Sequence, residues 1–239
     1  SKMCGSGMRA AMFAHDMLLA GSAQVVVAGG MESMTNAPYL LPKARGGLRM
    51  GHGETKDHMF LDGLEDAYEG RLMGTYGDEA ARAYQFSRDD QDAYAMESLA
   101  RAKRAVSDGS FASEIVPVTV KTRAGESEIV IDEQPGKADP KKIPNLKPAF
   151  AKDGTVTAAT SASISDGAAA LAIAGEAAVK ARGLNPIARI VGQASYAGKP
   201  GLFTSAPVHA IRRLFEKTGW SARDVDLFEI NEAFANVAM

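Results

Sequence analysis

Cys4 is the residue of this sequence best placed to act as a nucleophile, and it is the only cysteine. Two glycines and a serine follow it, and apolar residues then recur every three or four positions from Met8 to Leu19, which predicts a helix that Gly21 ends. Unpaired N–H groups and the dipole at a helix N-terminus stabilise an anion. A thiolate there would be a good nucleophile. The alternative is a structural role, because a lone cysteine often serves as a small buried apolar residue.

Three other groups of residues could support chemistry or binding. Asn231 and Glu232 follow a predicted strand, where they belong either to a site or to a simple turn. Lys137 lies in a stretch rich in Pro and Lys that either binds phosphate or forms a solvated basic loop. The small and hydroxyl side chains of residues 158–167 permit the close approach of an extended ligand.

The segments that must position these residues alternate between predicted strands and helices, which indicates an α/β layered fold. Two apolar strands are predicted to be buried on both faces, at 24–28 and 168–174, and others lie at 115–120, 127–131, 187–191 and 226–230. Helices are predicted at 75–84, 176–182 and 205–219, and from a Ser87–Asp90 capping box to Gly109. Residues 132–147 read as loop. The loop-rich stretch 35–86 is of a kind that is often functional.

The composition narrows the possible functions. A net charge of −2 gives no indication of a nucleic-acid or anionic-membrane partner, and no apolar run approaches the roughly 20 residues that cross a bilayer. The four histidines form no metal-ligand pattern with Cys4, so no metal site is predicted. One cysteine permits no internal disulfide, which fits a reducing compartment and predicts a cytoplasmic location.

Five stretches, in the same order along the chain, resemble the thiolase family. They are Cys-Gly-Ser-Gly-Met-Arg-Ala at 4–10, Gly-Gly-Met-Glu-Ser-Met at 29–34, Leu-Met-Gly-Thr at 72–75, Leu-Lys-Pro-Ala-Phe at 146–150 and Asn-Glu-Ala-Phe-Ala at 231–235. The resemblance implies a thiolase-like layered αβαβα fold, incomplete here at both ends, with a loop-rich α+β insertion. It places the end of the N-terminal half at 1–34 and 155–183, the loop domain that covers CoA at 35–154, and the start of the C-terminal half at 184–239.

The same resemblance implies roles for individual residues. Cys4 is the expected nucleophile, its backbone N–H contributes to one oxyanion site, and Asn231 positions a water in the other. The expected substrate and CoA contacts are Leu64, Leu72, Met73, Lys137, Phe150, Ser161, Ala162, Ser163, Phe203, Ala233 and Phe234. Three positions depart from the common pattern: Leu72 replaces a frequent His, Gly136 a frequent Arg, and Ala162 a frequent Ser.

The implied activity is that of an acyltransferase most like the acetyl-CoA acetyltransferase branch. It joins two acetyl-CoA molecules by Claisen condensation to give acetoacetyl-CoA, and runs the reverse thiolysis, through an acyl-cysteine intermediate. The histidine base of a Gly-His-Pro loop and the second cysteine of a Cys-x-Gly loop are not in this sequence, so this stretch alone is expected to be inactive. Two alternatives stay open: a longer-chain 3-ketoacyl-CoA thiolase, with Leu72 and Phe203 beside a wider tunnel, and an inactive thiolase-like module that binds acyl-CoA.

The partners implied are acetyl-CoA, acetoacetyl-CoA and CoA. No separate cofactor is expected, because the CoA thioester is itself the substrate. Thiolases pair through sheet edges around the strand that follows the nucleophile helix, here 24–28, so a homodimer or homotetramer is expected. Ketoacyl synthases share the layered architecture but use paired histidines and lack Asn-Glu-Ala-Phe. The sequence therefore favours a thiolase over a ketoacyl synthase.

Overall fold

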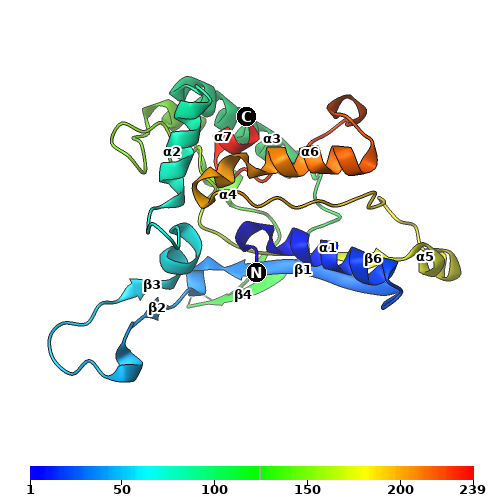
Figure 1. The fold of residues 1–239 in the computed structure, drawn as a ribbon, viewed down its shortest axis with the longest axis horizontal. Helices are drawn as coiled ribbons and strands as arrows, with labels where there is room; N and C mark the ends of the chain where they lie inside the picture. Colours follow the sequence, from blue (N-terminus) through cyan, green and yellow to red (C-terminus); the bar gives the residue numbers. More distant parts are fainter. Residues whose placement is uncertain (124) are drawn as a thin grey trace. The chain divides into compact units, whose positions relative to one another are not determined.

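A computed structural model describes residues 1–123 and 125–239, and its helices and strands follow one another as an α/β chain (Figure 1). The helices are α1 (Ser6–Leu19), α2 (Met73–Ala83), α3 (Arg88–Asp108), α4 (Gln134–Lys137), α5 (Glu176–Arg182), α6 (Ala206–Thr218) and α7 (Ala235–Ala238). The strands are β1 (Val25–Ser33), β2 (Tyr39–Leu40), β3 (Lys56–Asp57), β4 (Val118–Thr122), β5 (Gly125–Ile129) and β6 (Asp166–Ala174).

The chain packs as two compact units, which we describe one at a time. The first unit comprises Ser1–Met73 and Ser163–Glu229, and the second comprises Gly74–Ala162 and Ile230–Met239. These units reflect packing alone. The predicted boundaries between the two thiolase halves and the loop domain therefore stay a prediction.

The first unit is built on an antiparallel pair of strands, β1 and β6, with α1 packed against it (Figure 1). The register runs from Val25 opposite Ala174 to Ser33 opposite Asp166, and Gly29 lies opposite Ala170. A Cβ atom on Gly29 would overlap the carbonyl oxygen of Ala169 and would lie 2.9 Å from Ala170 Cα. Only glycine therefore fits the strand at this point.

The prediction that these two strands are buried on both faces is wrong. Ala28 is 6% exposed, but Val27 is 73% exposed and Leu171 57% exposed. The reason is that, among the described residues, β1 and β6 pair only with each other, so α1 covers one face and most of the other face meets solvent. Helix α1 itself is buried only at Ala14, with the rest of its apolar stripe partly exposed.

Two further strands predicted from sequence, at 187–191 and 226–230, do not form. A strand exists only where a second strand accepts and donates backbone hydrogen bonds, and none of the described residues pairs with these segments. The chain that follows the first of them is held by side chains instead. Gln193 Nε2 donates to the carbonyl of Met12 on α1 (3.3 Å), and Arg213 on α6 donates to the carbonyl of Ser195 (2.8 Å).

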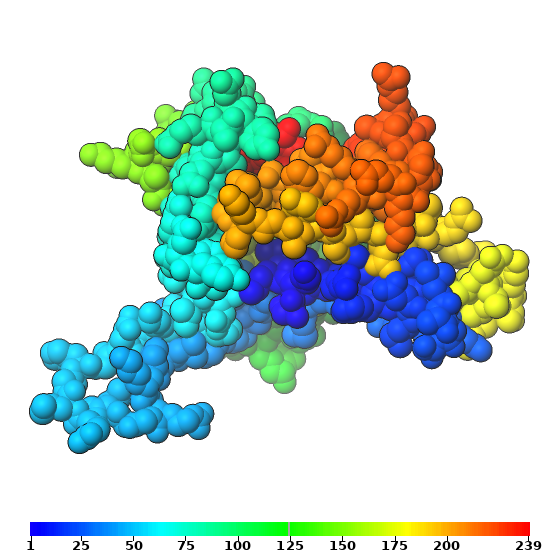
Figure 2. Space-filling model, in the orientation of Figure 1, coloured from blue at the N-terminus to red at the C-terminus, as the bar shows by residue number. Residues whose placement is uncertain are grey.

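Between β1 and α2, the first unit carries a long excursion. Strands β2 and β3 pair over two residues each, and the loop 41–55 between them extends away from these strands, as Figure 2 shows in light blue. Met50 in this loop is 96% exposed. Within the loop, a 3-10 turn forms at Ala44–Gly46.

The second unit is mainly helical, and its local signals match the sequence. Ser87 and Asp90 form the predicted capping box at the start of α3, and Gly109 ends the helix with φ of +73°. Strands β4 and β5 form the predicted hairpin, in register from Val118–Ile129 to Thr122–Gly125. Ala124 of its predicted turn lies outside the described residues. Within 132–147, predicted as loop, α4 and the 3-10 turn Pro140–Asn145 are helical.

Replacing Gly29 by Ala should disrupt the β1–β6 pair. The new methyl group would collide with backbone atoms, which cannot rotate away, and overpacking of this kind costs about 1–3 kcal/mol. Gly167 is the matched control, because it lies on β6 with open space around its Cβ position. Urea unfolding of the complete protein should show the loss for Gly29→Ala and about none for Gly167→Ala; equal effects would contradict the close approach.

The capping box makes stability depend on pH. Hydrogen bonds from the Ser87 hydroxyl, and then from its backbone N–H, hold the pKa of Asp90 below its ordinary value of 3.8. A lowered folded pKa gives stability that is present above the unfolded value and is lost as the pH falls through the folded one. Between pH 6 and pH 3.5, the unfolding midpoint should therefore fall less for Asp90→Asn than for the wild type. Asp89→Asn, its neighbour outside the capping box, should behave as the wild type does.

Candidate functional site

Cys4 lies on an exposed one-turn 3-10 helix, Met3–Gly5, that leads directly into α1. Gly5 is the N-cap residue of α1, and its backbone N–H donates to the carbonyl of Lys2 (3.0 Å). Met3 adopts φ of +49°, an unusual conformation for a residue other than glycine. The thiol is therefore presented to solvent just before a helix N-terminus, and the alternative reading of a buried apolar cysteine is wrong.

Two features fix this turn. The Ser6 hydroxyl accepts a hydrogen bond from the backbone N–H of Lys2 (2.8 Å) and donates one to the carbonyl of Met3 (2.7 Å). Below the turn, α1 meets β1 through glycines: a Cβ atom on Gly30 would lie 3.1 Å from Gly7 Cα. The first two sequence motifs therefore come together, because the glycines of one allow close contact with the backbone of the other.

The first unit also holds five of the predicted substrate contacts. Leu64 ends a π-helical turn, Phe60–Leu64, and the next residue, Glu65, forms a β-bridge with Leu72. Met73 begins α2 directly after that bridge. Ser163 hydrogen-bonds Ser165 through their hydroxyl groups (2.7 Å), and Phe203 is half-buried in the 3-10 segment Pro200–Ser205. The structure thus brings Leu64, Leu72 and Met73 into one short stretch.

In the second unit, the Asn-Glu-Ala-Phe segment pairs with the small-residue stretch. Ala162 N–H donates to the carbonyl of Ala233 (3.0 Å), and Ala235 N–H donates to the carbonyl of Thr160 (2.9 Å). Ser161 and Phe234 form a β-bridge between these two bonds. Four predicted contact residues, Ser161, Ala162, Ala233 and Phe234, are therefore neighbours despite lying about 70 residues apart in the sequence.

Phe150 joins the same cluster through its ring. It packs edge-to-face on Phe234, with ring centroids 5.9 Å apart and planes at 86°, a favoured aromatic geometry. Helix α2 makes room for both rings with glycine: a Cβ atom on Gly74 would overlap the Phe150 ring, and one on Gly77 would lie 3.3 Å from the Phe234 ring. Phe234 is 6% exposed, so it belongs to the hydrophobic core of the unit as well as being a predicted substrate contact.

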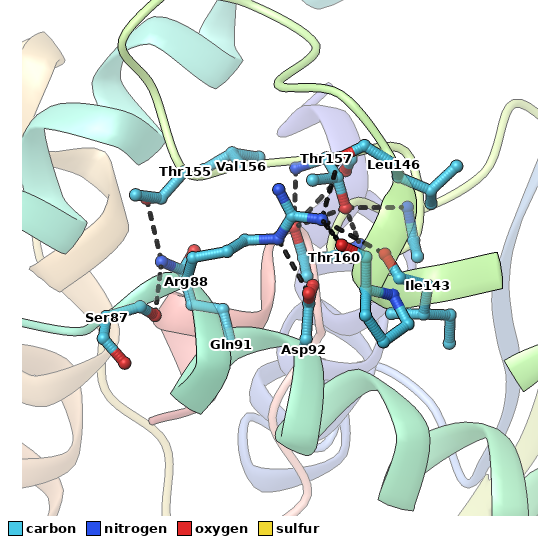
Figure 3. Close-up of polar contacts among 12 residues, drawn as sticks. Ser87, Arg88, Gln91, Asp92, Ile143, Leu146, Thr155, Val156, Thr157 and Thr160 are labelled. Carbon is cyan, nitrogen blue, oxygen red and sulfur yellow. Dashed lines mark hydrogen bonds and ion pairs between the residues drawn. The ribbon is translucent and has the colours of Figure 1, made fainter. Parts of the chain in front are cut away.

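A buried polar frame holds the loop that carries Phe150, and sequence reasoning missed it. Asp78 Oδ1 accepts the backbone N–H groups of Thr155 (2.8 Å) and Val156 (2.9 Å). Gln91 Nε2 donates to the Thr155 hydroxyl (2.9 Å; Figure 3). A Cβ atom on Gly154 would lie 2.6 Å from Asp78 Cγ, so the loop needs glycine there. The available signal was a polar residue, Gln91, four positions before Ala95 on the buried face of α3.

Arg88 extends this frame to the adjacent loop. Its guanidinium donates to the Asp92 carboxylate (2.7 Å) and to the backbone carbonyls of Ile143 (3.1 Å) and Leu146 (2.8 Å; Figure 3). Asp92 is largely buried, so the pair satisfies a charge that would otherwise be costly to bury. The fork geometry of arginine suits this role, because one side chain reaches both a carboxylate and the three carbonyls of Ile143, Pro144 and Leu146.

Two other predicted site residues, Asn231 and Lys137, are both exposed but lie in different local structures. Asn231 is exposed, and its backbone carbonyl accepts the N–H of Ala233 (2.9 Å) in a tight turn. Lys137 is exposed on α4 and pairs with Glu133 at 3.4 Å, rather than joining the Phe150–Phe234 cluster. The expectation that Lys137 binds phosphate stays a prediction.

Among residues 1–123 and 125–239, no group of three or more His, Cys, Asp and Glu side chains is arranged to hold a metal ion. No helix in that part of the chain has the length and apolar character needed to cross a membrane.

Family models match nearly all of the sequence. The model for the N-terminal domain of thiolase matches residues 1–177, and the model for the C-terminal domain matches residues 184–239. An acetyl-CoA acetyltransferase of Pseudomonas aeruginosa is 44% identical over 237 residues, which is 98% of this chain and 60% of the relative. Acetyl-CoA acetyltransferase 1 of Arabidopsis thaliana is 46% identical over 243 residues, 100% of this chain and 58% of the relative.

Solved structures agree with the sequence matches. The crystal structure of an acetyl-CoA acetyltransferase from Bacillus anthracis has a TM-score of 0.94 and 40% identity, and the match covers 99% of this chain and 60% of that one. The predicted thiolase-like α/β fold is thereby confirmed. The chain spans about 60% of the length of the curated relatives it matches.

The contact between α2 and Phe150 can be tested with a double-mutant cycle. Gly74→Ala should lower the free energy of unfolding by about 1–3 kcal/mol, because the new methyl group overlaps the Phe150 ring. In a Phe150→Ala background, where the ring is gone, the same change should cost less than about 0.5 kcal/mol, so the two substitutions couple. Chemical denaturation of the four proteins measures the coupling, and strictly additive effects would show that the ring does not depend on Gly74.

Proposed function

This chain belongs to the thiolase family, and from that premise we propose that the protein it forms part of is an acetyl-CoA acetyltransferase. The proposed reaction joins two acetyl-CoA molecules to give acetoacetyl-CoA and free CoA, and the reverse direction is thiolysis. The observation that carries the proposal is the exposed Cys4, set on a fixed turn at the N-terminus of α1.

The proposed first step is transfer of the acetyl group to Cys4. The thiolate attacks the thioester carbon of acetyl-CoA, a new carbon–sulfur bond forms, and CoA leaves as its thiolate, which takes up a proton. The setting supports this role, because N–H groups at a helix N-terminus stabilise an anionic sulfur. Ser6 and the Gly7–Gly30 contact hold the turn, which supports our proposal that the backbone N–H of Cys4 contributes to an oxyanion site.

The proposed second step forms the carbon–carbon bond. A second acetyl-CoA loses a proton from its methyl carbon to a base, the resulting carbanion attacks the acetyl carbon on Cys4, and the Cys4 sulfur leaves. We assign to Asn231 the positioning of a water that stabilises the oxyanion of this second acetyl-CoA. The exposed position of Asn231 in its turn is consistent with that role.

The proposed binding residues fall into two groups. Phe150, Ser161, Ala162, Ala233 and Phe234 form one contiguous cluster in the second unit, of the small-residue and aromatic type that suits an extended chain such as pantetheine. Leu64, Leu72, Met73, Ser163 and Phe203 lie in the first unit, and we assign them to the acyl group and the adjoining CoA arm. CoA is a substrate and product here rather than a bound cofactor.

We further propose that the working enzyme is a cytoplasmic homodimer or homotetramer. The support is physical: β1 and β6 expose apolar side chains such as Val27 and Met31 (79%) on the face away from α1. An exposed apolar sheet surface of this kind is a recurrent feature of protein–protein contacts.

Substrate preference tests the proposal in the complete enzyme. We expect kcat/KM for thiolysis of acetoacetyl-CoA to exceed that for a ten-carbon 3-ketoacyl-CoA by at least about 10-fold. Cys4→Ala should abolish turnover with both, because no acyl-enzyme can form. Preference for the ten-carbon substrate would assign the protein to the degradative thiolases, and binding of acyl-CoA without turnover by the wild type would indicate an inactive module.

A further inference from the structure

Glu232, the residue after Asn231, is held by two hydroxyl groups of α3. Tyr94 Oη donates to Glu232 Oε1 (2.9 Å), and Ser98 Oγ donates to Glu232 Oε2 (2.7 Å). Each carboxylate oxygen therefore has its own donor, and hydrogen bonds to an ionised group are roughly twice as strong as neutral ones. We call these three side chains the Glu232 clamp.

The two donors of the clamp lie on one face of α3, the face that contacts Glu232. Tyr94 and Ser98 are four residues apart, so their side chains lie one above the other on the helix surface. Arg101, three residues further, lies on the same side: its pKa is raised mainly by its hydrogen bond to Glu97, and the charge of Glu232 adds to the effect. Helix α3 is itself fixed at its start by the capping box and by Arg88.

The turn that carries Asn231 is anchored by the residues that follow Asn231. Downstream, Ala233 and Ala235 are bonded to the 160–162 stretch, and Asn236 Nδ2 donates to the carbonyl of Gly77 on α2 (2.7 Å). Within the turn itself, the Ala233 N–H bonds back to the Asn231 carbonyl. The Glu232 side chain ties this turn to α3 through Tyr94 and Ser98.

We propose that the Glu232 clamp is a positioning device for Asn231, acting on the carbon–carbon bond-forming step and not on acetylation of Cys4. This inference rests on the proposed function, which gives Asn231 its oxyanion water. A displacement of about 1 Å in a group that supports catalysis can cost about 100-fold in rate. Two directed hydrogen bonds on the adjacent residue are a direct way to prevent such a displacement.

Glu232 could in principle take a proton from substrate or hold the turn in place. A general base must reach the proton that it removes. Hydroxyl groups of α3 hold both carboxylate oxygens of Glu232. We therefore assign Glu232 a positioning role, whose effect on the reaction is transmitted through the backbone of the turn.

The experiment uses the complete enzyme with Tyr94→Phe, Ser98→Ala and the double variant. Each single change should lower kcat for condensation about 3- to 10-fold and the double change about 30- to 100-fold, with KM within about twofold. The rate of stoichiometric acetylation of Cys4 by acetyl-CoA, followed by mass spectrometry, should stay within about twofold of the wild type. That split between the two steps is the signature of positioning, because general loss of structure would slow both.

The matched control is Ser107→Ala, on the same helix, where the hydroxyl bonds only to the helix carbonyl of Arg104 (2.9 Å). It should leave both steps unchanged, and Ser98→Thr, which keeps a hydroxyl, should recover most of the condensation rate. Unchanged condensation in the double variant, or equal losses in both steps with a lower melting temperature, would overturn the inference. An inactive wild-type enzyme would instead contradict the proposed function.

Discussion

The buried carboxylate of Asp78 is the interaction on which the second unit depends. The Asp78 side chain projects from α2 and accepts hydrogen bonds from the backbone N–H groups of Thr155 and Val156. Gly154 allows this loop to pass close to the carboxylate. Because burying a polar group is costly unless it is hydrogen-bonded, these two bonds favour one register between the loop and the helix. That register places Phe150 over Gly74 and leads the chain to Thr160, whose carbonyl receives Ala235. The surface made by Phe150, Ser161 and Phe234 therefore follows from a carboxylate that none of the substrate motifs contains.

In the first unit, glycines rather than a buried carboxylate fix how the segments pack against one another. Gly29 against Ala169 brings backbone to backbone at a distance that no Cβ atom allows, and Gly30 against Gly7 leaves only a tight space for one. Helix α1 is thereby seated on β1 at its first turn, just where Cys4 precedes it. Direct contact between rigid main-chain segments leaves little freedom of position, which is what the nucleophilic role proposed for Cys4 would require of its support.

Features that depend on neighbouring residues were predictable from the sequence, and features that depend on distant partners were not. The Ser87–Asp90 box, the glycines that end helices and the β4–β5 hairpin are local, and all were predicted. The strands expected at 187–191 and 226–230 failed because apolar β-branched content does not supply a partner strand. The motif residues at 161–162 and 233–234 came from resemblance to a family, and only the structure shows that they bridge each other. Asp78 and the partners of Glu232 gave no local signal, because their contacts span 77 and 134–138 residues.

The loop between β2 and β3 has a consequence for how the sequence can change during evolution. Two residue pairs hold its base, so loss of the loop 41–55 would remove few contacts from the β1–β6 sheet or from α1. Segments with so little packing tolerate insertion, deletion and exchange of residues far better than a core does. We therefore expect length and surface chemistry to vary most readily in this stretch, whereas Gly29 and Gly30 beneath the helix that follows Cys4 leave little room for larger residues.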